Sequence, residues 1–314
     1  MNVFAMPLGS RDRGSSRLRC YRVMDFMEGD VKFVFAWKVI STCDVVFIQK
    51  RCDDFALSLS NACKSCKMPM VYDLDDDFSL YHGSMPMAQQ ATVVTVDTPE
   101  RAERVRSVRN GPVVVIPSGV DYLSAPVSPR THHGSIQRIF TFGDRHSVIS
   151  GLDWMRPFWG QYDVSYVSDR EYSHAARFVE WSEAGFIWDA LKNDVCVLSH
   201  ETGSAARKGN NRLMTMMALG IPTAVRSCTP SYVSLLERAG HEWLVYDTHE
   251  QLCGIMEKLE DPGLRTEVSK ALSEQVWSFA HPAETSKKFA ELFTGLAEKR
   301  PPGSRIHTLL REVK

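Results

Sequence analysis

One stretch decides the fold class: Ser199-His-Glu-Thr-Gly-Ser-Ala-Ala-Arg-Lys-Gly-Asn-Asn-Arg-Leu-Met-Thr-Met-Met-Ala-Leu-Gly-Ile-Pro222. An apolar run ends at Ser199 and is followed by a loop of small residues. A helix is expected from Asn210 or Asn211, because asparagine is a favoured N-cap residue. The Gly-Ile-Pro sequence at 220–222 ends that helix and begins the next strand. A strand, a loop, a helix and a second strand in this order are typical of a parallel α/β sheet.

The loop before this helix carries charges that suit an anionic ligand. Backbone N–H groups at a helix N-terminus bind phosphate through their free donors and the helix dipole. Lys208 and Arg212 would flank that position with full positive charges, which suits a diphosphate. The alternative is a capped surface helix with solvated basic residues, and the residue types alone leave both interpretations open.

The same alternation of apolar runs and helical patterns extends along the whole chain. We expect strands at 2–8, 44–49, 69–74, 92–96 and 113–116, then at 138–142, 164–167, 195–199, 222–225 and 243–246. Continuous apolar strands between helices indicate parallel sheets covered on both faces. Between 111 and 134, proline, glycine and the pair His132-His133 indicate a linker, whose histidines we expect to be solvated.

The predicted fold class is therefore α/β, with two Rossmann-like doubly wound domains facing a cleft. We place the first domain at 1–133 and the second at 134–280, followed by a helix at 281–299 that packs back on the first domain and a tail at 300–314. Ligands of such sheets bind at the carboxyl ends of the strands, so the cleft between the domains is the default site.

Composition excludes several classes of protein. The 314 residues are 44% hydrophobic and 24% charged, which is an ordinary globular balance and not that of a disordered or fibrous chain. A formal net charge of −1 argues against a generic binder of polyanions. Eight cysteines are scattered, and the CxxC at 63–66 has no second pair for a zinc ribbon.

The expected location of the protein rests on two sequence patterns that the chain lacks, a membrane-spanning stretch and a secretory signal. No stretch approaches the ~20 apolar residues that span a bilayer. The N-terminal apolar run precedes its basic cluster, which is the reverse of a secretory signal. We therefore expect a cytoplasmic protein with no transmembrane segment.

The stretch from Lys208 to Pro222 resembles the donor-binding segment of GT-B glycosyltransferases, especially the retaining family-4 group, which reads roughly K-x-x-N-R-L-x-E-A-L-A-x-G-x-P. Four further segments resemble family elements in the right order, namely GSSRLR at 14–19, VYDLDDD at 71–77, VVVIPSGVD at 113–121 and FTFGD at 140–144. The resemblance implies transfer of a sugar from a nucleotide diphosphate-sugar, a UDP- or GDP-sugar, to an acceptor hydroxyl with retention. It implies no metal and no other cofactor.

The resemblance also implies the residues of the site. Those expected to bind the donor are Gly143, Asp144, Arg145, His200, Glu201, Lys208, Gly209, Asn210, Asn211, Arg212 and Thr215; those expected on the acceptor side are Gly14, Ser15, Arg17 and His82. Lys208 and Arg212 would neutralise the departing diphosphate and count as catalytic. Thr215 stands where the family often has a glutamate, so a carboxylate there cannot bind the donor ribose. Glu201 is the candidate we assign to that role in its place.

Two charged clusters leave alternatives open. Asp73 and Asp75, in the acidic run 73–77, are candidate catalytic carboxylates, because a carboxylate at a strand end can accept the acceptor proton. The same run could hold a metal, as in the other glycosyltransferase fold, or cap a loop. Five arginines crowd the first loop and helix and could face a diphosphate, an anionic acceptor or solvent: Arg11, Arg13, Arg17, Arg19 and Arg22. Because Arg17 and Arg19 cannot share one helix face, only part of this cluster is expected to point inward.

Two other functions compete with the leading one. A phage-type DNA glycosyltransferase acting on hydroxymethylated pyrimidines would use the arginines to grip DNA, although the near-zero net charge does not favour it. A non-catalytic GT-B-like module would bind a nucleotide without transfer. The expected partners are thus a nucleotide-sugar and an unidentified acceptor, modified DNA or another large molecule.

Overall fold

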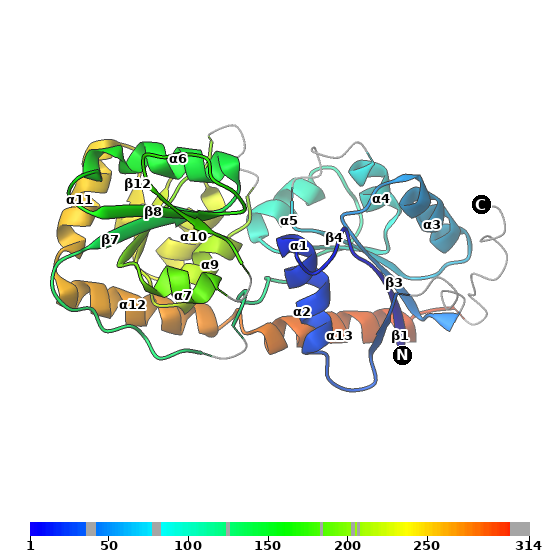
Figure 1. Cartoon of the computed structure of the whole chain (residues 1–314). Coiled ribbons are helices and arrows are strands. Elements are labelled where there is room, and N and C mark those ends of the chain that lie inside the picture. Colours follow the sequence, from blue (N-terminus) through cyan, green and yellow to red (C-terminus); the bar gives the residue numbers. More distant parts are fainter. Residues whose placement is uncertain are drawn as a thin grey trace. The chain divides into compact units, whose positions relative to one another are not determined.

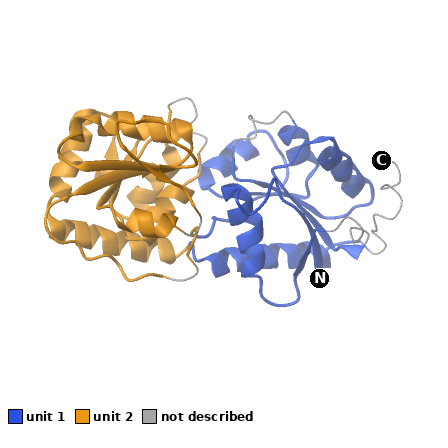
Figure 2. Cartoon of the chain, in the orientation of Figure 1, with its two compact units in different colours: residues 1–119, 280–314 blue, residues 120–279 orange. Residues whose placement is uncertain are grey.

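The computed structural model describes residues 1–35, 42–76, 83–123, 126–182, 185–201, 205 and 208–301. The chain forms two compact units, one of residues 1–119 with 280–314 and one of residues 120–279 (Figure 2). Segment 120–133, which the sequence analysis placed in the first domain, is counted here with the second unit. Each unit contains a six-stranded sheet in which every strand pair is parallel (Figure 1). The predicted α/β class with two Rossmann-like domains is confirmed.

The sheet of unit 1 has the strand order β2-β1-β3-β4-β5-β6. Its strands are β1 (Asn2–Met6), β2 (Lys32–Val34), β3 (Val45–Gln49), β4 (Met70–Leu74), β5 (Val93–Val96) and β6 (Val113–Val115). Its helices are α1 (Gly14–Ser16), the π-helix η1 (Arg17–Tyr21), α2 (Arg22–Asp25), α3 (Asp54–Ser65), α4 (Ser84–Gln90), α5 (Pro99–Arg106) and α13 (Pro282–Glu298).

Two hydrophobic cores cover the two faces of this sheet, because successive strand residues point to opposite sides. Phe4 and Met6 of β1 pack into the core that α3, α4 and α5 complete. Val3 and Ala5 pack into the core that η1, α2 and α13 complete. Figure 1 shows α13 lying along unit 1 beside α2, although more than 250 residues separate them in the sequence. The chain therefore returns to the first unit to finish its core.

The sheet of unit 2 has the strand order β12-β11-β10-β7-β8-β9. Its strands are β7 (Arg138–Phe142), β8 (Asp163–Ser168), β9 (Arg177–Glu180), β10 (Val195–Leu198), β11 (Thr223–Arg226) and β12 (Val245–Tyr246). Its helices are α6 (Arg145–Met155), η4 (Arg156–Phe158), α7 (Phe186–Leu191), α9 (Asn211–Ala218), α10 (Pro230–Arg238), η5 (Glu242–Leu244), α11 (His249–Leu259) and α12 (Pro262–Trp277).

The segment before β7 is fixed to unit 2, which corrects the expectation of a solvated linker at His132. This histidine is only 5% exposed, and its Nε2 lies 2.9 Å from the hydroxyl of Ser269 on α12. Its backbone N–H donates to Thr266 at 3.0 Å. Burial, together with the charges of Arg130 and Arg265, lowers the pKa of His132 to about 4. This proline-rich segment is therefore packed against α12 at His132 and is not a free linker there.

No helix formed by the described residues is both long enough and apolar enough to cross a lipid bilayer.

Candidate functional site

The candidate donor site lies where strand order reverses in unit 2. Strands β7 and β10 are neighbours, but the chain leaves β7 through α6 toward β8 and leaves β10 through α9 toward β11. Figure 1 shows α6 on one face of the sheet and α9 on the other. A crevice opens at the carboxyl ends of two such strands, and ligands of open α/β sheets bind there.

Arg212, the second residue of α9, binds both β7 and α6 at this edge of the sheet. Its Nη1 donates to the carbonyl of Phe142 at the end of β7, at 2.7 Å. Its Nη2 donates to the hydroxyl of Ser147 in α6, at 2.9 Å. The guanidinium is half-buried, so its charge is held at the carboxyl edge by contacts to both neighbouring elements.

Gly143 makes room for that guanidinium. Its φ is +133°, a conformation that residues with a side chain rarely adopt. A Cβ at this position would lie 2.5 Å from Nη1 of Arg212 and 3.3 Å from Cβ of Ser147. Gly143 is among the residues predicted to bind the donor, and the structure shows its backbone in close approach to Arg212.

His200 lies beneath Arg212 and is almost completely buried. Its Nδ1 is 2.9 Å from Nη2 of Arg212, and its Nε2 is 3.2 Å from the hydroxyl of Tyr232 on α10. Burial, followed by the charges of Arg212 and Lys208, lowers the pKa of His200 to about 2. The imidazole is therefore neutral. Nη2 of Arg212 also lies 2.7 Å from Nε2, so Arg212 can donate to whichever ring nitrogen carries no proton.

Lys208 and Asp144 face each other at this carboxyl edge of the sheet. The ammonium of Lys208 lies 3.6 Å from Oδ2 of Asp144, and both side chains are partly exposed. Asp144 caps α6 by accepting from the backbone N–H of Ser147 at 2.9 Å and from its hydroxyl at 2.8 Å. Burial alone would raise the pKa of Asp144, but these bonds and the charges of Arg212 and Lys208 lower it to about 2. An anionic ligand would compete with Asp144 for Lys208.

The N-cap side chain does not bind the backbone N–H groups at the start of α9, and a phosphate site needs such uncapped groups. Asn210 is the N-cap residue, but its side chain makes no capping hydrogen bond. Oδ1 of Asn211 is buried and has no hydrogen-bond partner within the described part of the chain. Gly209, just before the cap, is half-buried. This helix start offers N–H groups beside Arg212 and Lys208.

Three predicted donor residues lie outside this group of contacts. Arg145 is exposed at the first position of α6. Glu201 is exposed and its Oε1 lies 3.1 Å from Nδ1 of His146. Thr215 is buried, and its hydroxyl donates to the carbonyl of Asn211 one turn earlier, at 2.9 Å. Their role in donor binding stays a prediction.

Two residues of the network were not predicted. Ser147 contacts Asp144, His200 and Arg212 through its hydroxyl, and Tyr232 is fully buried against His200. Ser147 could have been found, because it is the residue whose N–H an N-cap at Asp144 would bind. Tyr232 had no such signal, since it follows His200 by 32 positions and lies on α10.

In unit 1, Asp73 is part of a buried ion pair. Its carboxylate oxygens accept from Nη2 of Arg19 at 2.6 Å and from Nε at 3.1 Å. The hydroxyl of Thr95 also donates to Asp73, at 2.7 Å. Both charged side chains are inaccessible to solvent. This arrangement ties η1 to β4, and the catalytic role of Asp73 stays a prediction.

Asp75 is also ion-paired. Its Oδ1 lies 2.8 Å from the ammonium of Lys50, which also binds Asp76 at 2.5 Å. Burial alone would raise the pKa of Asp75, but Lys50 and the charges of Arg19 and Arg101 lower it. Within the described ranges, no three His, Cys, Asp or Glu side chains are grouped as a metal site would need.

The acceptor-side predictions fall at the carboxyl edge of β1 and β3. Gly14 and Ser15 lie in α1, and Ser16 beside them donates to Oε1 of Gln49 at the end of β3. Arg17 is only 3% exposed, and its Nη1 donates to the carbonyl of Arg11 at 3.2 Å. His82 and Asp77 lie outside the described residues.

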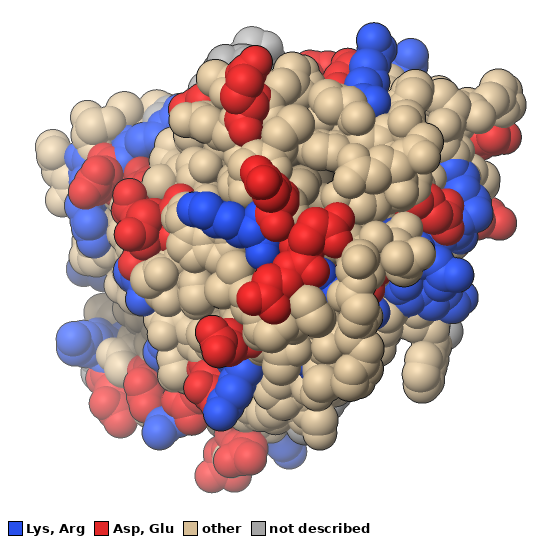
Figure 3. Space-filling model, turned by 90° about the vertical axis from the view of Figure 1, so that its left-hand side faces the viewer, with Lys and Arg blue, Asp and Glu red and all other residues tan. Residues whose placement is uncertain are grey.

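The arginine cluster is not one exposed basic surface. Only part of the cluster points inward, as expected, because Arg11 and Arg13 are exposed whereas Arg17 and Arg19 are both buried. They reach different partners, the loop carbonyls and Asp73, because they project from different sides of η1. Arg11 pairs with Asp25 at 2.6 Å. Figure 3 faces unit 2 rather than this cluster, and on that face acidic and basic side chains are interspersed.

Solved structures share this fold. HepE (Alr3699) of Anabaena, in complex with UDP and glucose, matches with a TM-score of 0.68 at 14% identity, over 94% of this chain and 99% of its own. The lipopolysaccharide outer core galactosyltransferase WaaB, in its apo form, matches with a TM-score of 0.66 at 10% identity, over 94% and 99%. A glycosyltransferase from Rickettsia africae ESF-5 matches with a TM-score of 0.66 at 10% identity, over 95% and 98%. The predicted GT-B fold is confirmed by these likenesses.

The sequence matches no protein-family model and no curated protein at a significant level.

Proposed function

We propose that this protein is a glycosyltransferase that moves a sugar from a nucleotide diphosphate-sugar to an acceptor hydroxyl. One observation carries the proposal: Arg212, Lys208 and the open start of α9 converge at the strand-order reversal of a GT-B domain. The presence of UDP and glucose in the structure of HepE supports a UDP-sugar as the first donor to test.

The proposed reaction needs positive charge where the diphosphate leaves. The bond between the anomeric carbon and the phosphate oxygen breaks, and the acceptor oxygen forms a bond to that carbon. The acceptor proton passes to the leaving phosphate, so no protein base is obligatory in this scheme. Lys208, Arg212 and the N–H groups of α9 would stabilise the developing negative charge. The resemblance of the segment 208–222 to family-4 enzymes leads us to propose retention of anomeric configuration.

We propose that the donor site functions without a bound metal, because cationic side chains and a helix start would meet the diphosphate charge there. Asp73 and Asp75, the candidate metal ligands, are each paired with a cation in unit 1.

The test combines ligand binding and turnover. UDP-, GDP-, CDP-, ADP- and dTDP-sugars are screened by thermal shift with and without EDTA, and hydrolysis of the bound donor is then followed by release of the nucleotide. A ligand at 100 times its Kd adds about 2.7 kcal/mol to stability. We expect one nucleotide family to raise Tm equally with and without EDTA.

The variant Lys208→Ala should fold normally and lose about 100-fold or more in turnover, because it removes one charge contact to the leaving group. Lys270→Ala is the matched control, since Lys270 is an exposed lysine of the same unit and lies 3.9 Å from Glu274. Unchanged turnover in Lys208→Ala would remove the diphosphate assignment. Absence of a shift with any nucleotide-sugar would contradict the proposal as a whole.

A further inference from the structure

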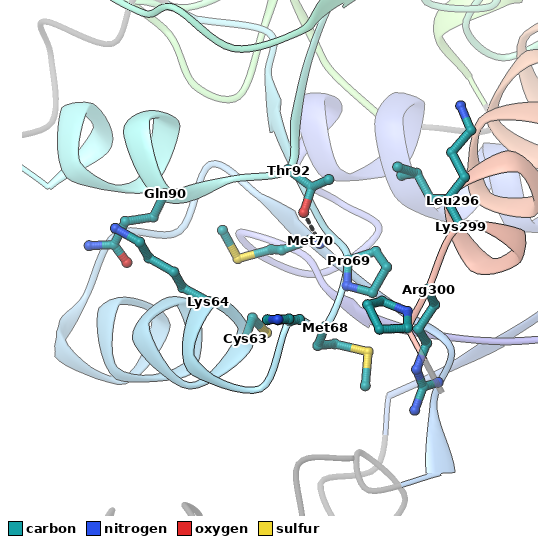
Figure 4. A pocket seen from close by; sticks show the side chains of 12 residues that line it. Cys63, Lys64, Met68, Pro69, Met70, Gln90, Thr92, Leu296, Lys299 and Arg300 are labelled. Atoms are coloured by element: carbon teal, nitrogen blue, oxygen red, sulfur yellow. Dashed lines mark hydrogen bonds between the residues drawn. The ribbon is translucent and has the colours of Figure 1, made fainter. Parts of the chain in front are cut away.

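Unit 1 contains a pocket at the amino edge of its sheet, opposite the strand ends that carry Asp73 and Asp75 (Figure 4). Its volume is about 350 Å³, within the range of small-molecule sites. The C-terminal end of α3, the start of β4, the residue before β5 and the end of α13 form its walls. This pocket has no part in the proposed donor site, which lies in unit 2.

The pocket combines an apolar floor with a basic rim. Met68, Pro69 and Met70 are buried at the floor, and Leu296 of α13 is half-buried beside them. Among the described residues, the rim carries four cationic side chains and no carboxylate; the cations are Lys64, Lys67, Lys299 and Arg300. Figure 4 shows Lys64 and Lys299 on opposite sides of the pocket.

The four cations differ in whether a described residue binds them. Nη1 of Arg300 donates to the carbonyl of Cys43 at 3.0 Å and lies 3.3 Å from Oδ1 of Asp44. Lys64, Lys67 and Lys299, by contrast, form no ion pair or hydrogen bond through their ammonium groups with any described residue.

Helix ends account for only part of this charge. Both α3 and α13 end at the pocket, and lysines near helix C-termini offset the negative end of the dipole. Each helix end is equivalent to about half a negative charge. Two such ends balance about one of these three lysines, so the described lining of the pocket retains a net positive charge.

Lys67 occupies a position that normally selects glycine. The N–H of Met68 binds the carbonyl of Cys63 at 2.8 Å, and the N–H of Lys67 binds that of Lys64 at 3.3 Å, which is the Schellman pattern at the end of α3. Lys67 is its left-handed residue, with a φ of +56°. A lysine is less stable than glycine in this conformation. A strained residue whose side chain lines a pocket suggests that the charge serves a ligand.

We propose that this pocket binds a small organic anion, with an apolar body on Met68, Pro69, Met70 and Leu296 and a carboxylate, phosphate or sulfonate held by Lys64, Lys67 and Lys299. The apolar floor selects against inorganic ions, and the lysines select against neutral apolar molecules. The ligand chemistry differs from that of a nucleotide-sugar, and the site is independent of the proposed function.

The test uses the fluorescent probe 1-anilinonaphthalene-8-sulfonate and its uncharged analogue N-phenyl-1-naphthylamine, which share the apolar body and differ in the sulfonate. The full chain is titrated with each probe at low and high salt. We expect tighter binding of the sulfonate, weakened by salt, and no displacement by UDP.

Lysine variants separate the effect of the positive charge on sulfonate binding from any effect on the stability of the chain. Lys67→Gly should bind the sulfonate several-fold more weakly while its Tm stays at or above that of the native chain. The triple variant Lys64→Gln, Lys67→Gly, Lys299→Gln should lose at least about tenfold in affinity. Lys287→Gln, which changes an exposed lysine of α13 outside the pocket lining, is the matched control and should bind the sulfonate like the native chain.

Three results would overturn the proposal. They are unchanged sulfonate affinity in the triple variant, equal affinity of the native chain for the charged and the uncharged probe, and displacement of the sulfonate by UDP.

Discussion

Gly143 lies where the backbone of β7 turns toward α6, with a φ of +133° and the guanidinium of Arg212 against its Cα. In Gly143→Ala the new methyl group would lie 2.5 Å from Nη1 of Arg212, so the bond from Arg212 to the Phe142 carbonyl must break or lengthen. We expect a loss of about 1–3 kcal/mol in the free energy of unfolding, from backbone strain and the displaced guanidinium. Urea titration measures the stability, and calorimetry measures the accompanying loss of UDP affinity.

The control for this prediction is Gly254→Ala. Gly254 lies inside α11, where an added Cβ meets no atom within 4 Å. Alanine there should stabilise the chain by about 0.5–1 kcal/mol, because glycine is a poor helix former. If Gly143→Ala behaved like Gly254→Ala, the close contact with Arg212 would have no structural importance.

His200 should make stability depend on pH. Burial and the charges of Arg212 and Lys208 lower its pKa from 6.5 to about 2 in the folded chain. Between these values the unfolded chain binds a proton at His200 and the folded chain does not, so stability falls as pH decreases from about 6.5. At pH 5 this loss is at most about 2 kcal/mol. In urea unfolding, the loss of stability between pH 7 and pH 5 should be smaller in His200→Gln than in the native chain, by up to about 2 kcal/mol.

The comparison separates the effect of His200 from that of His132, which is the second buried histidine among the described residues. The pKa of His132 is also lowered, to about 4, and it contributes equally in the native chain and in His200→Gln. An identical change of stability with pH in both chains would mean that the His200 imidazole is charged in the folded state or accessible to protons.

At the scale of secondary-structure elements, Arg19 holds several pieces of unit 1 together. From η1 its guanidinium binds Asp73 on β4 and the carbonyl of Ile116 after β6, and it lies 5.1 Å from the ring centre of Phe289 on α13. Asp73→Asn would leave a buried, poorly compensated positive charge. We expect a loss of about 3–5 kcal/mol in the free energy of unfolding, measured by urea titration.

The exposed pair Arg156 and Asp153 provides the comparison, with both side chains more than half exposed. Asp153→Asn should cost no more than about 1 kcal/mol. If Asp73→Asn kept native stability and lost transfer of the sugar, the structural role of Asp73 would be refuted and the catalytic prediction favoured.

Most elements of the fold could be predicted from the sequence, because central strands of parallel sheets are continuous apolar runs. Val45–Gln49 and Val195–Leu198 are buried throughout and were found in this way. Strand β9, Arg177–Glu180, was not predicted, since it is an edge strand whose end residues are exposed. Its pairing with β8 determines its structure, and pairing partners are not encoded locally.

The candidate site could be predicted where its residues follow a strand or lie at the start of a helix. Gly143, Asp144, Lys208 and Arg212 follow β7 and β10, and the structure brings them together because those strands are neighbours. The pair of Arg19 and Asp73 spans 54 positions and joins two different elements. No local sequence pattern predicts which arginine of the first helix pairs with which aspartate.

At the scale of the whole molecule, the chain passes between its two units twice, near 119 and near 279, so unit 1 contains two segments distant in sequence whereas unit 2 is continuous. The donor-site residues all belong to unit 2, whereas the buried ion pairs of Asp73 and Asp75 and the basic pocket belong to unit 1. Binding of a nucleotide therefore acts directly on the stability of one unit.

We expect hydrogen exchange to show where this effect falls. UDP at 100 times its Kd stabilises the unit that binds it by about 2.7 kcal/mol. Amides in peptides covering 142–148 and 208–218 should exchange more slowly, since they contain the end of β7, the first turn of α6 and all of α9. Peptides covering β3 and β4 of unit 1 serve as the internal reference and should change little. If UDP protected β3 and β4 most strongly, the nucleotide would bind unit 1, and the roles of Lys208 and Arg212 would have to be abandoned.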